Sequence, residues 1–142
     1  MKITQLSLFI ENRPGQLSSV CRILQQNNIN ISTLSMADTQ SFGILRLLVK
    51  EHARAKDVLE KAGFVVKTTE VLAIPVDNQP GGLAQLLDTL KDCQVEYMYA
   101  FASEVHDRAV MVFRFADPDK ALEVLKAAHG DIIQAAELFT LN

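Results

Sequence analysis

Two short segments carry residue types that could bind an anion at the start of a helix. The first, from Asn12 to Leu17, reads N-R-P-G-Q-L, and the second, from Asn78 to Leu83, reads N-Q-P-G-G-L. Proline suits the first helical turn, glycine lets a ligand approach the backbone, and the Asn amide both donates and accepts. The first N–H groups of a helix have no partner within it, and its dipole favours negative charge there. Each segment therefore predicts a small cup that suits a carboxylate.

Two acidic residues, Asp38 and Glu104, could complete such a cup for an amino acid. Each ends a predicted strand, and we expect both at the same end of the sheet as the cups, where a carboxylate could accept from an ammonium group. The acid that faces a given cup could belong to the other half of the chain or to another chain. A helix end contributes only about 0.3–1 kcal/mol when exposed, whereas micromolar binding needs about 8 kcal/mol. A surrounding pocket must therefore supply most of the affinity.

A structural role is the alternative for the same residues. A Pro-Gly turn before a helix is common, an Asn in that place often caps the helix, and Asp38 and Glu104 could be solvated turn residues. Binding is favoured because Asn, Pro, Gly and Leu recur together where most other positions differ, although folding alone could preserve a turn.

The recurrence extends along the whole chain at a constant shift of 66 residues, since Asn12 matches Asn78. No gap is needed. Further identical pairs at this shift are Pro14 and Pro80, Gly15 and Gly81, Leu17 and Leu83, Leu24 and Leu90, and Leu59 and Leu125. The pattern indicates an internal duplication.

One unit of the repeat has the pattern strand-helix-strand-strand-helix-strand. Alternating apolar residues mark the strands and apolar stripes at helical spacing mark the helices, in the order Leu6–Ile10, Leu17–Leu24, Ile29–Asp38, Ile44–Val49, Ala55–Ala62 and Phe64 onward. This order predicts an α+β fold made of two ferredoxin-like βαββαβ units, each with both helices on one face of an antiparallel sheet. In the second unit we expect Gly130 to end the second helix, with His129 in its last turn.

We expect the two units to span residues 1–68 and 69–142 without a linker. At the shift of 66, the last strand of one unit overlaps the first strand of the next. This overlap predicts one continuous strand from Phe64 to Val76 that leaves one sheet and enters the other. Pro75 would then lie at an edge or a bend, where its missing N–H is tolerated.

Composition excludes several classes of partner. The chain has 142 residues, 49% of them hydrophobic, and a net charge of −3, which favours neither nucleic acid nor an anionic membrane. No apolar run approaches eighteen residues, so we expect no membrane span and a cytoplasmic location. Cys21 and Cys93 are expected to be reduced core thiols. The histidines lack a second ligand at metal-binding spacing, so we expect no metal and no cofactor.

The duplicated N-x-P-G-x-L turn, set in two βαββαβ units, resembles tandem ACT domains, and Arg13–Leu17 is its most family-like segment. The resemblance covers nearly the whole chain and implies an allosteric regulatory module that binds amino acids at interfaces between paired ACT units. It implies binding residues at Asn12, Arg13, Pro14, Gly15, Gln16 and Leu17, and at Asn78, Gln79, Pro80, Gly81, Gly82 and Leu83. The family's habit also implies a homodimer. The family often has Asp where Asn12 and Asn78 stand, and Gln79 replaces the Arg, so the second site could differ in its ligand or be empty.

Other functions of this topology fit the sequence less well. Tyr97, Tyr99 and Phe101 alternate as in an RNA-binding sheet, but the acidic charge and the first unit do not support that function. No C-x-x-C occurs in the first turn, and no nucleophile–base grouping indicates an enzyme, so a small ferredoxin-like enzyme is a remote alternative. Two readings stay open: an amino-acid sensor, and a regulatory subunit that docks on a separate enzyme, as the small subunit of acetolactate synthase does.

Overall fold

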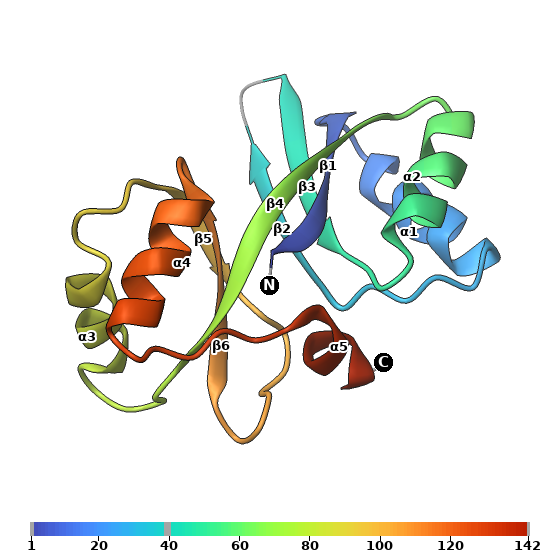
Figure 1. Cartoon of the computed structure of the whole chain (residues 1–142). Helices are drawn as coiled ribbons and strands as arrows, with labels where there is room; N and C mark the ends of the chain where they lie inside the picture. The colour runs from blue at the N-terminus through green and yellow to red at the C-terminus, as the bar shows by residue number, and fades with distance from the viewer. Residues whose placement is uncertain (1, 39–40, 142) are drawn as a thin grey trace. The chain divides into compact units, whose positions relative to one another are not determined.

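The computed structural model describes residues 2–38 and 41–141, which divide into two compact units (Figure 1). The N-terminal unit comprises Thr4–Thr69, and the C-terminal unit comprises Glu70–Leu141 together with residues 2–3. The strands follow the hydrogen-bonded order β2-β3-β1-β4-β6-β5. The predicted α+β class with two ferredoxin-like units is confirmed.

The N-terminal unit has the predicted order of elements. They are β1 (Ile3–Glu11), α1 (Gln16–Gln26), β2 (Thr33–Asp38), β3 (Phe42–Leu48), α2 (His52–Lys61) and the first half of β4 (Val65–Val76). Both β1 and β2 pair antiparallel with β3, so that Leu6 and Leu34 each lie opposite Leu47. The strand β2 is therefore separated from β1 by β3.

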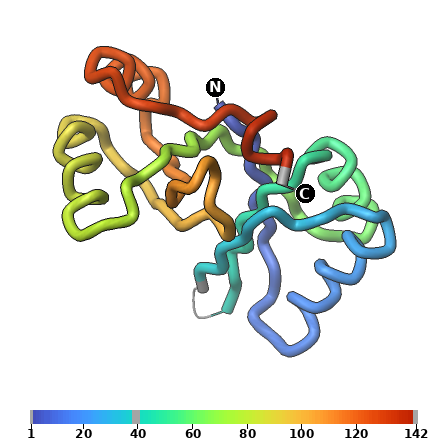
Figure 2. Tube along the Cα trace, turned by 90° about the horizontal axis from the view of Figure 1, so that it is seen from below, coloured from blue at the N-terminus to red at the C-terminus, as the bar shows by residue number. Residues whose placement is uncertain are grey.

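The core of this unit lies between the sheet and its two helices. Alternate residues of β1, among them Leu6 and Leu8, are fully buried against Val20 of α1 and Leu59 of α2. Because these strand residues share one face, both helices must cover that face. Figures 1 and 2 show α1 and α2 side by side on it.

The C-terminal unit repeats this plan with the second half of β4. Its further elements are α3 (Gly82–Thr89), β5 (Val95–Ala100), β6 (Ala109–Phe115), α4 (Pro118–Ala127), α5 (Ala135–Leu138) and the 3-10 turn η1 (Phe139–Leu141). Leu72 of β4 lies opposite Phe113 of β6, and both are buried in a core with Leu125 of α4. Asp117 caps α4 by accepting from the N–H of Lys120 at 3.1 Å.

The strand β4 is continuous over 12 residues, as the overlap of the repeats predicts. Its Ala73 carbonyl accepts from the N–H of Ile133 at 2.8 Å, so the polar groups of Ala73 face away from β6. Successive residues of a strand alternate in this direction, so the nitrogen of Pro75 also faces away from β6. Pro75, which has no N–H, therefore removes no hydrogen bond between β4 and β6. This agrees with the prediction that it lies where a missing N–H is tolerated.

The repeat fails at the end of the second unit. Where the shift of 66 would place a strand equivalent to the start of β4, only Ile133 forms an isolated bridge, and α5 follows. Ala135–Leu138 favours helix, and Gln134 with Glu137 forms a capping box at its start. The end of α4 also differs from the prediction: His129, with φ 56°, takes the left-handed position after the helix rather than Gly130.

Candidate ligand sites at the repeated turns

The two Pro-Gly turns share the same pattern of backbone hydrogen bonds. Each contains three N–H···O bonds, and these match one for one at the shift of 66. In the first turn they are Arg13 to Glu11 (2.9 Å), Gln16 to Arg13 (3.4 Å) and Ser19 to Gly15 (2.9 Å). In the second they are Gln79 to Asp77 (2.9 Å), Gly82 to Gln79 (3.0 Å) and Gln85 to Gly81 (3.0 Å). The duplication therefore preserves the conformation of the turn as well as its sequence.

Gly15 and Gly81 take the backbone conformation that makes each turn. Their φ angles are 90° and 86°, in the region that favours glycine, and each is the residue directly before its helix. A Cβ added at either position would meet no atom within 4 Å. The positive φ angle, and not a lack of space, therefore favours glycine at both positions. The space above each helix start is open.

Neither helix start is capped by a side chain. The helices α1 and α3 begin at Gln16 and Gly82, with no acidic residue in the first turn and no side-chain cap among residues 2–38 and 41–141. Asn12 and Asn78 lie too early to cap, which rules out the structural explanation that an Asn there is a helix cap. Gln16 and Gly82 donate to backbone oxygens within their own turns, so the next N–H groups, those of Leu17, Ser18, Leu83 and Ala84, are the ones that could meet an external acceptor.

A charged group stands beside the first turn. Arg13 Nε lies 3.0 Å from Glu11 Oε2, and both side chains are exposed. With the Gln16 amide turned so that its oxygen faces Arg13, that oxygen accepts from Nε at 3.2 Å and from Nη2 at 3.0 Å. The guanidinium is therefore held at the turn by its own neighbours, in a place where it could meet a carboxylate.

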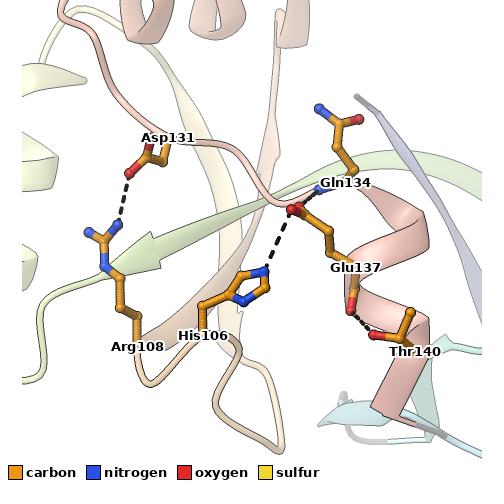
Figure 3. A network of polar contacts seen from close by, with 6 residues as sticks. All are labelled: His106, Arg108, Asp131, Gln134, Glu137 and Thr140. Carbon is orange, nitrogen blue, oxygen red and sulfur yellow. Dashed lines mark hydrogen bonds and ion pairs between the residues drawn. The ribbon is translucent and has the colours of Figure 1, made fainter.

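The second turn has no arginine of its own, and Arg108 approaches it from the β5–β6 loop. Its Nη2 lies 3.2 Å from Oδ1 of Asp77, and its Nη1 donates to Oδ2 of Asp131 at 2.9 Å (Figure 3). Within residues 2–38 and 41–141, its buried Nε finds no hydrogen-bond acceptor. Arg108 is not one of the site residues that the sequence predicts.

A tight hairpin turn places Arg108. Val105 and Arg108 exchange backbone hydrogen bonds of 3.0 and 3.1 Å, and the two residues between them, His106 and Asp107, have φ angles of 51° and 59°. Two consecutive positive φ angles are typical of a type I′ turn, for which Asn-Gly is the usual sequence signal. His-Asp gives no such signal.

Gly82 is packed more closely than its counterpart Gln16. A Cβ at Gly82 would collide with the backbone oxygen of Asp77. The second turn is therefore tighter at this position and admits no side chain there. The two turns therefore differ in the space beside their helix starts.

The remaining candidates lie at the predicted end of the sheet. The backbone of Asp38 pairs with Gly43, which also pairs with Ile10, so the ends of β2 and β1 lie at the same end of the N-terminal sheet. The side chain of Asp38 lies outside the described part of the structure. Glu104 is exposed in the loop that joins β5 and β6.

The described residues 2–38 and 41–141 contain no group of three or more His, Cys, Asp or Glu that could hold a metal ion. In the same part of the chain, no helix is long and apolar enough to cross a membrane. Cys21 is half-buried and Cys93 buried, and both are free thiols.

The family model that describes an ACT domain pair matches residues 1–142. The chain belongs to the ACT domain pair family. The predicted resemblance is thus confirmed over the whole sequence. A search of curated proteins gave no match.

Solved structures share the fold of this ACT pair. Protein BT0572 from Bacteroides thetaiotaomicron is 39% identical, with a TM-score of 0.91 over 99% of this chain and 97% of that one. The ligand-free regulatory subunit of aspartate kinase from Thermus thermophilus is 19% identical, with a TM-score of 0.66 over 89% of this chain and 90% of that one. The corresponding subunit from Thermus flavus is 17% identical, with a TM-score of 0.62 over the same shares.

Proposed function

We propose that this ACT pair is a non-catalytic regulatory protein that binds a small ligand, an amino acid, at its two Pro-Gly turns. One turn belongs to each of the ACT-like units 1–68 and 69–142. The observation that carries the proposal is the matched pair of turns, in which the same hydrogen bonds and left-handed glycines precede helices without side-chain caps. With glycine at the N-cap, no side chain of that residue occupies the helix start, which leaves room there for a ligand.

The turns offer partners for both charged groups of an amino acid. Its carboxylate would accept from the N–H groups of Leu17 and Ser18 in the first turn, with Arg13 beside it. In the second turn Leu83 and Ala84 would take this role. Asp38 and Glu104 are the proposed acceptors for the ammonium group. The first turn holds the side chain of Gln16 at the position where the second turn has room only for Gly82, so we expect the two sites to differ in affinity.

The regulatory step would be a change in the population of two conformations. A ligand shifts such an equilibrium only by the difference in its affinity for the two states. We propose that this allosteric shift is passed to another chain in the cytoplasm and that the ACT pair works as a homodimer. The same conformation and the same partner affinity with and without ligand would contradict this mechanism.

A second candidate function is a subunit that docks on a separate amino-acid-metabolism enzyme. It is supported by Leu34 and Met36 on β2, the first strand in the order of the sheet, which are 44% and 41% exposed. An exposed strand with apolar side chains is a common site of protein association. The two similar structures from Thermus are regulatory subunits of aspartate kinase, which agrees with this candidate.

A thermal-shift screen against the twenty amino acids and their 2-keto acids tests the proposal. A ligand at a hundredfold excess over Kd adds about 2.7 kcal/mol, which should raise Tm by roughly 5–10 °C. We expect Asn12→Ala to weaken the effect and Gly15→Val to remove the part that comes from the first turn.

Gly63→Val is the matched control, because Gly63 has φ 96° and open space above its Cα but follows the end of α2 and precedes no helix start. It should lower Tm as Gly15→Val does, while keeping the ligand response. No response to any compound would contradict amino-acid binding and favour the docking subunit.

A further inference from the structure

The C-terminal unit contains a cleft of about 390 Å³ that adjoins the second Pro-Gly turn. Gly82, the first residue of α3, lines it together with Gln85 and Thr89 of the same helix. Asp77, which lies just before the turn, and Arg108 also line it. Its lining is mainly polar, and its volume lies within the range of small-molecule sites. The cleft is therefore a part of the second candidate site.

The repeat relates two arginine–carboxylate pairs, one at each turn. Glu11 and Asp77 correspond at the shift of 66, and each carboxylate lies beside a guanidinium. The distances are 3.0 Å from Glu11 to Arg13 and 3.2 Å from Asp77 to Arg108. Arg13 itself corresponds to Gln79, which carries no charge. Arg108, from the β5–β6 loop, thus supplies the second turn with the cation that the first turn has in its own sequence.

The two arginines differ in one hydrogen bond. In the first turn, Nε of Arg13 lies 3.2 Å from the amide oxygen of Gln16 when that amide is turned toward it. Gly82 corresponds to Gln16 and has no side chain, and a Cβ there would collide with the oxygen of Asp77. Among residues 2–38 and 41–141, Nε of Arg108 is buried and finds no acceptor. A buried donor without an acceptor costs about 1–3 kcal/mol, so an acceptor oxygen from outside the chain would stabilise Arg108.

The charges around Arg108 favour an uncharged acceptor. Its Nη2 lies 3.2 Å from Oδ1 of Asp77, and its Nη1 donates to Oδ2 of Asp131 at 2.9 Å, the contact that Figure 3 shows. A third carboxylate would be repelled by the two that share this guanidinium. An ammonium could pair with either carboxylate but cannot accept from Nε. A primary carboxamide does both, since its oxygen can accept from Nε while its NH₂ group donates to one of the carboxylates.

We propose that the second site is selective for an amino acid whose side chain ends in a primary carboxamide, as in glutamine and asparagine. The amide lies in the cleft and does for Arg108 what the amide of Gln16 does for Arg13. The ligand's own carboxylate meets the N–H groups of Leu83 and Ala84. The inference rests on the proposed function, to which it adds the class of side chain. Arg108 is then the residue that determines specificity at the second turn.

Amide NMR of the isotope-labelled full chain tests this class of ligand, with the signals of Gly82 and Leu83 as reporters of the second site. His129 also lines the cleft, so the titration is run at about pH 7.5, where a histidine is largely uncharged. The probes are L-glutamine and L-asparagine, compared with L-glutamate and L-lysine. We expect saturable shifts with at least one carboxamide, and binding of both charged probes that is weaker by roughly fivefold or more.

Failure of this inference can be told apart from failure of the proposed function. If another amino acid moves the two reporters with an affinity equal to or higher than that of both carboxamides, the inference is overturned and the proposed function stands. If none of the twenty amino acids moves Gly82 and Leu83, the inference is overturned. If the amides of Leu17 and Ser18 also stay unmoved, so is the proposed function.

Matched variants test the role of Arg108. Arg108→Lys keeps a positive charge beside Asp77 and Asp131 but removes Nε–H, so it should weaken carboxamide binding at the second site by roughly fivefold or more. Arg13→Lys makes the same change at the first turn and should leave the second site unaffected. Asp131→Asn, at a side chain that is 72% exposed, removes one repelling charge and should narrow the preference for the carboxamide over glutamate by about two- to fivefold. Unchanged carboxamide binding in Arg108→Lys overturns the inference, and if that variant does not fold, an unchanged preference in Asp131→Asn does.

Discussion

Replacing the left-handed glycines by alanine should cost the same free energy at three separate places. Gly15, Gly63 and Gly81 have φ angles of 90°, 96° and 86°, and a Cβ would meet no atom within 4 Å at any of them. The added methyl group would clash with no atom, so only the strained backbone conformation contributes to the loss of stability. The left-handed region costs an L-residue about 1–2 kcal/mol, and alanine regains roughly 0.4–1 kcal/mol by restricting the unfolded chain. The expected net loss is about 1 kcal/mol at each position.

Urea denaturation of the three alanine variants measures these losses. A loss of 1 kcal/mol corresponds to a drop in Tm of about 2–4 °C for a chain of this size. The three values should agree to within about 0.5 kcal/mol, since the three φ angles are alike and a Cβ meets no atom within 4 Å at any of the sites. Asparagine, which tolerates the left-handed region better, should lose less than alanine at each site. Alanine variants as stable as the wild type, or one site costing several times more than another, would refute the reasoning.

Three further changes have expected outcomes. Gly82→Ala should lower the free energy of unfolding by about 1–3 kcal/mol, because the new Cβ would collide with the backbone oxygen of Asp77. This loss should exceed that of Gly81→Ala, and equal losses in urea denaturation would contradict the expectation. Leu59→Ala should cost about 2–5 kcal/mol, since this side chain is fully buried in the N-terminal core; a loss below 1 kcal/mol would show that the core is loosely packed. Hydrogen bonding to Asp119, with the nearby charge of Glu70, raises the pKa of Lys2 above its ordinary value. The stabilisation from Lys2 is then fully present below the unfolded-state pKa of about 10.4 and is lost as the pH rises through the higher folded pKa. Melting curves of Lys2→Met should lack this alkaline loss.

The duplication made most of the fold predictable from the sequence. A shift that aligns Pro14 with Pro80 and Leu59 with Leu125 requires two units of the same topology, and the overlap of their strands requires the continuous β4. Each helix and strand of the first unit also has a clear apolar period. These signals are local and occur in both units, so they are sufficient to predict the order of helices and strands.

Predictions made from the repeat are wrong or incomplete where a few residues change the local structure. The strand predicted after α4 is replaced by α5, because an Ala-Ala-Glu-Leu segment with its own capping box forms a helix instead. Arg108 reaches Asp77 only through a hairpin turn whose His-Asp sequence is atypical of that turn. The exclusion of a side chain at Gly82 depends on the position of one carbonyl oxygen. None of these contacts can be derived from apolar periodicity.

The central claim is that the repeated turns bind an amino acid through the N–H groups of the helix starts. Titration of isotope-labelled protein with the amino acid that gives the largest thermal shift, followed by amide NMR, tests it most directly. We expect saturable shifts at the amides of Leu17 and Ser18, and at Leu83 and Ala84 if the second turn is occupied. Saturable binding that leaves all four amides unmoved would contradict it.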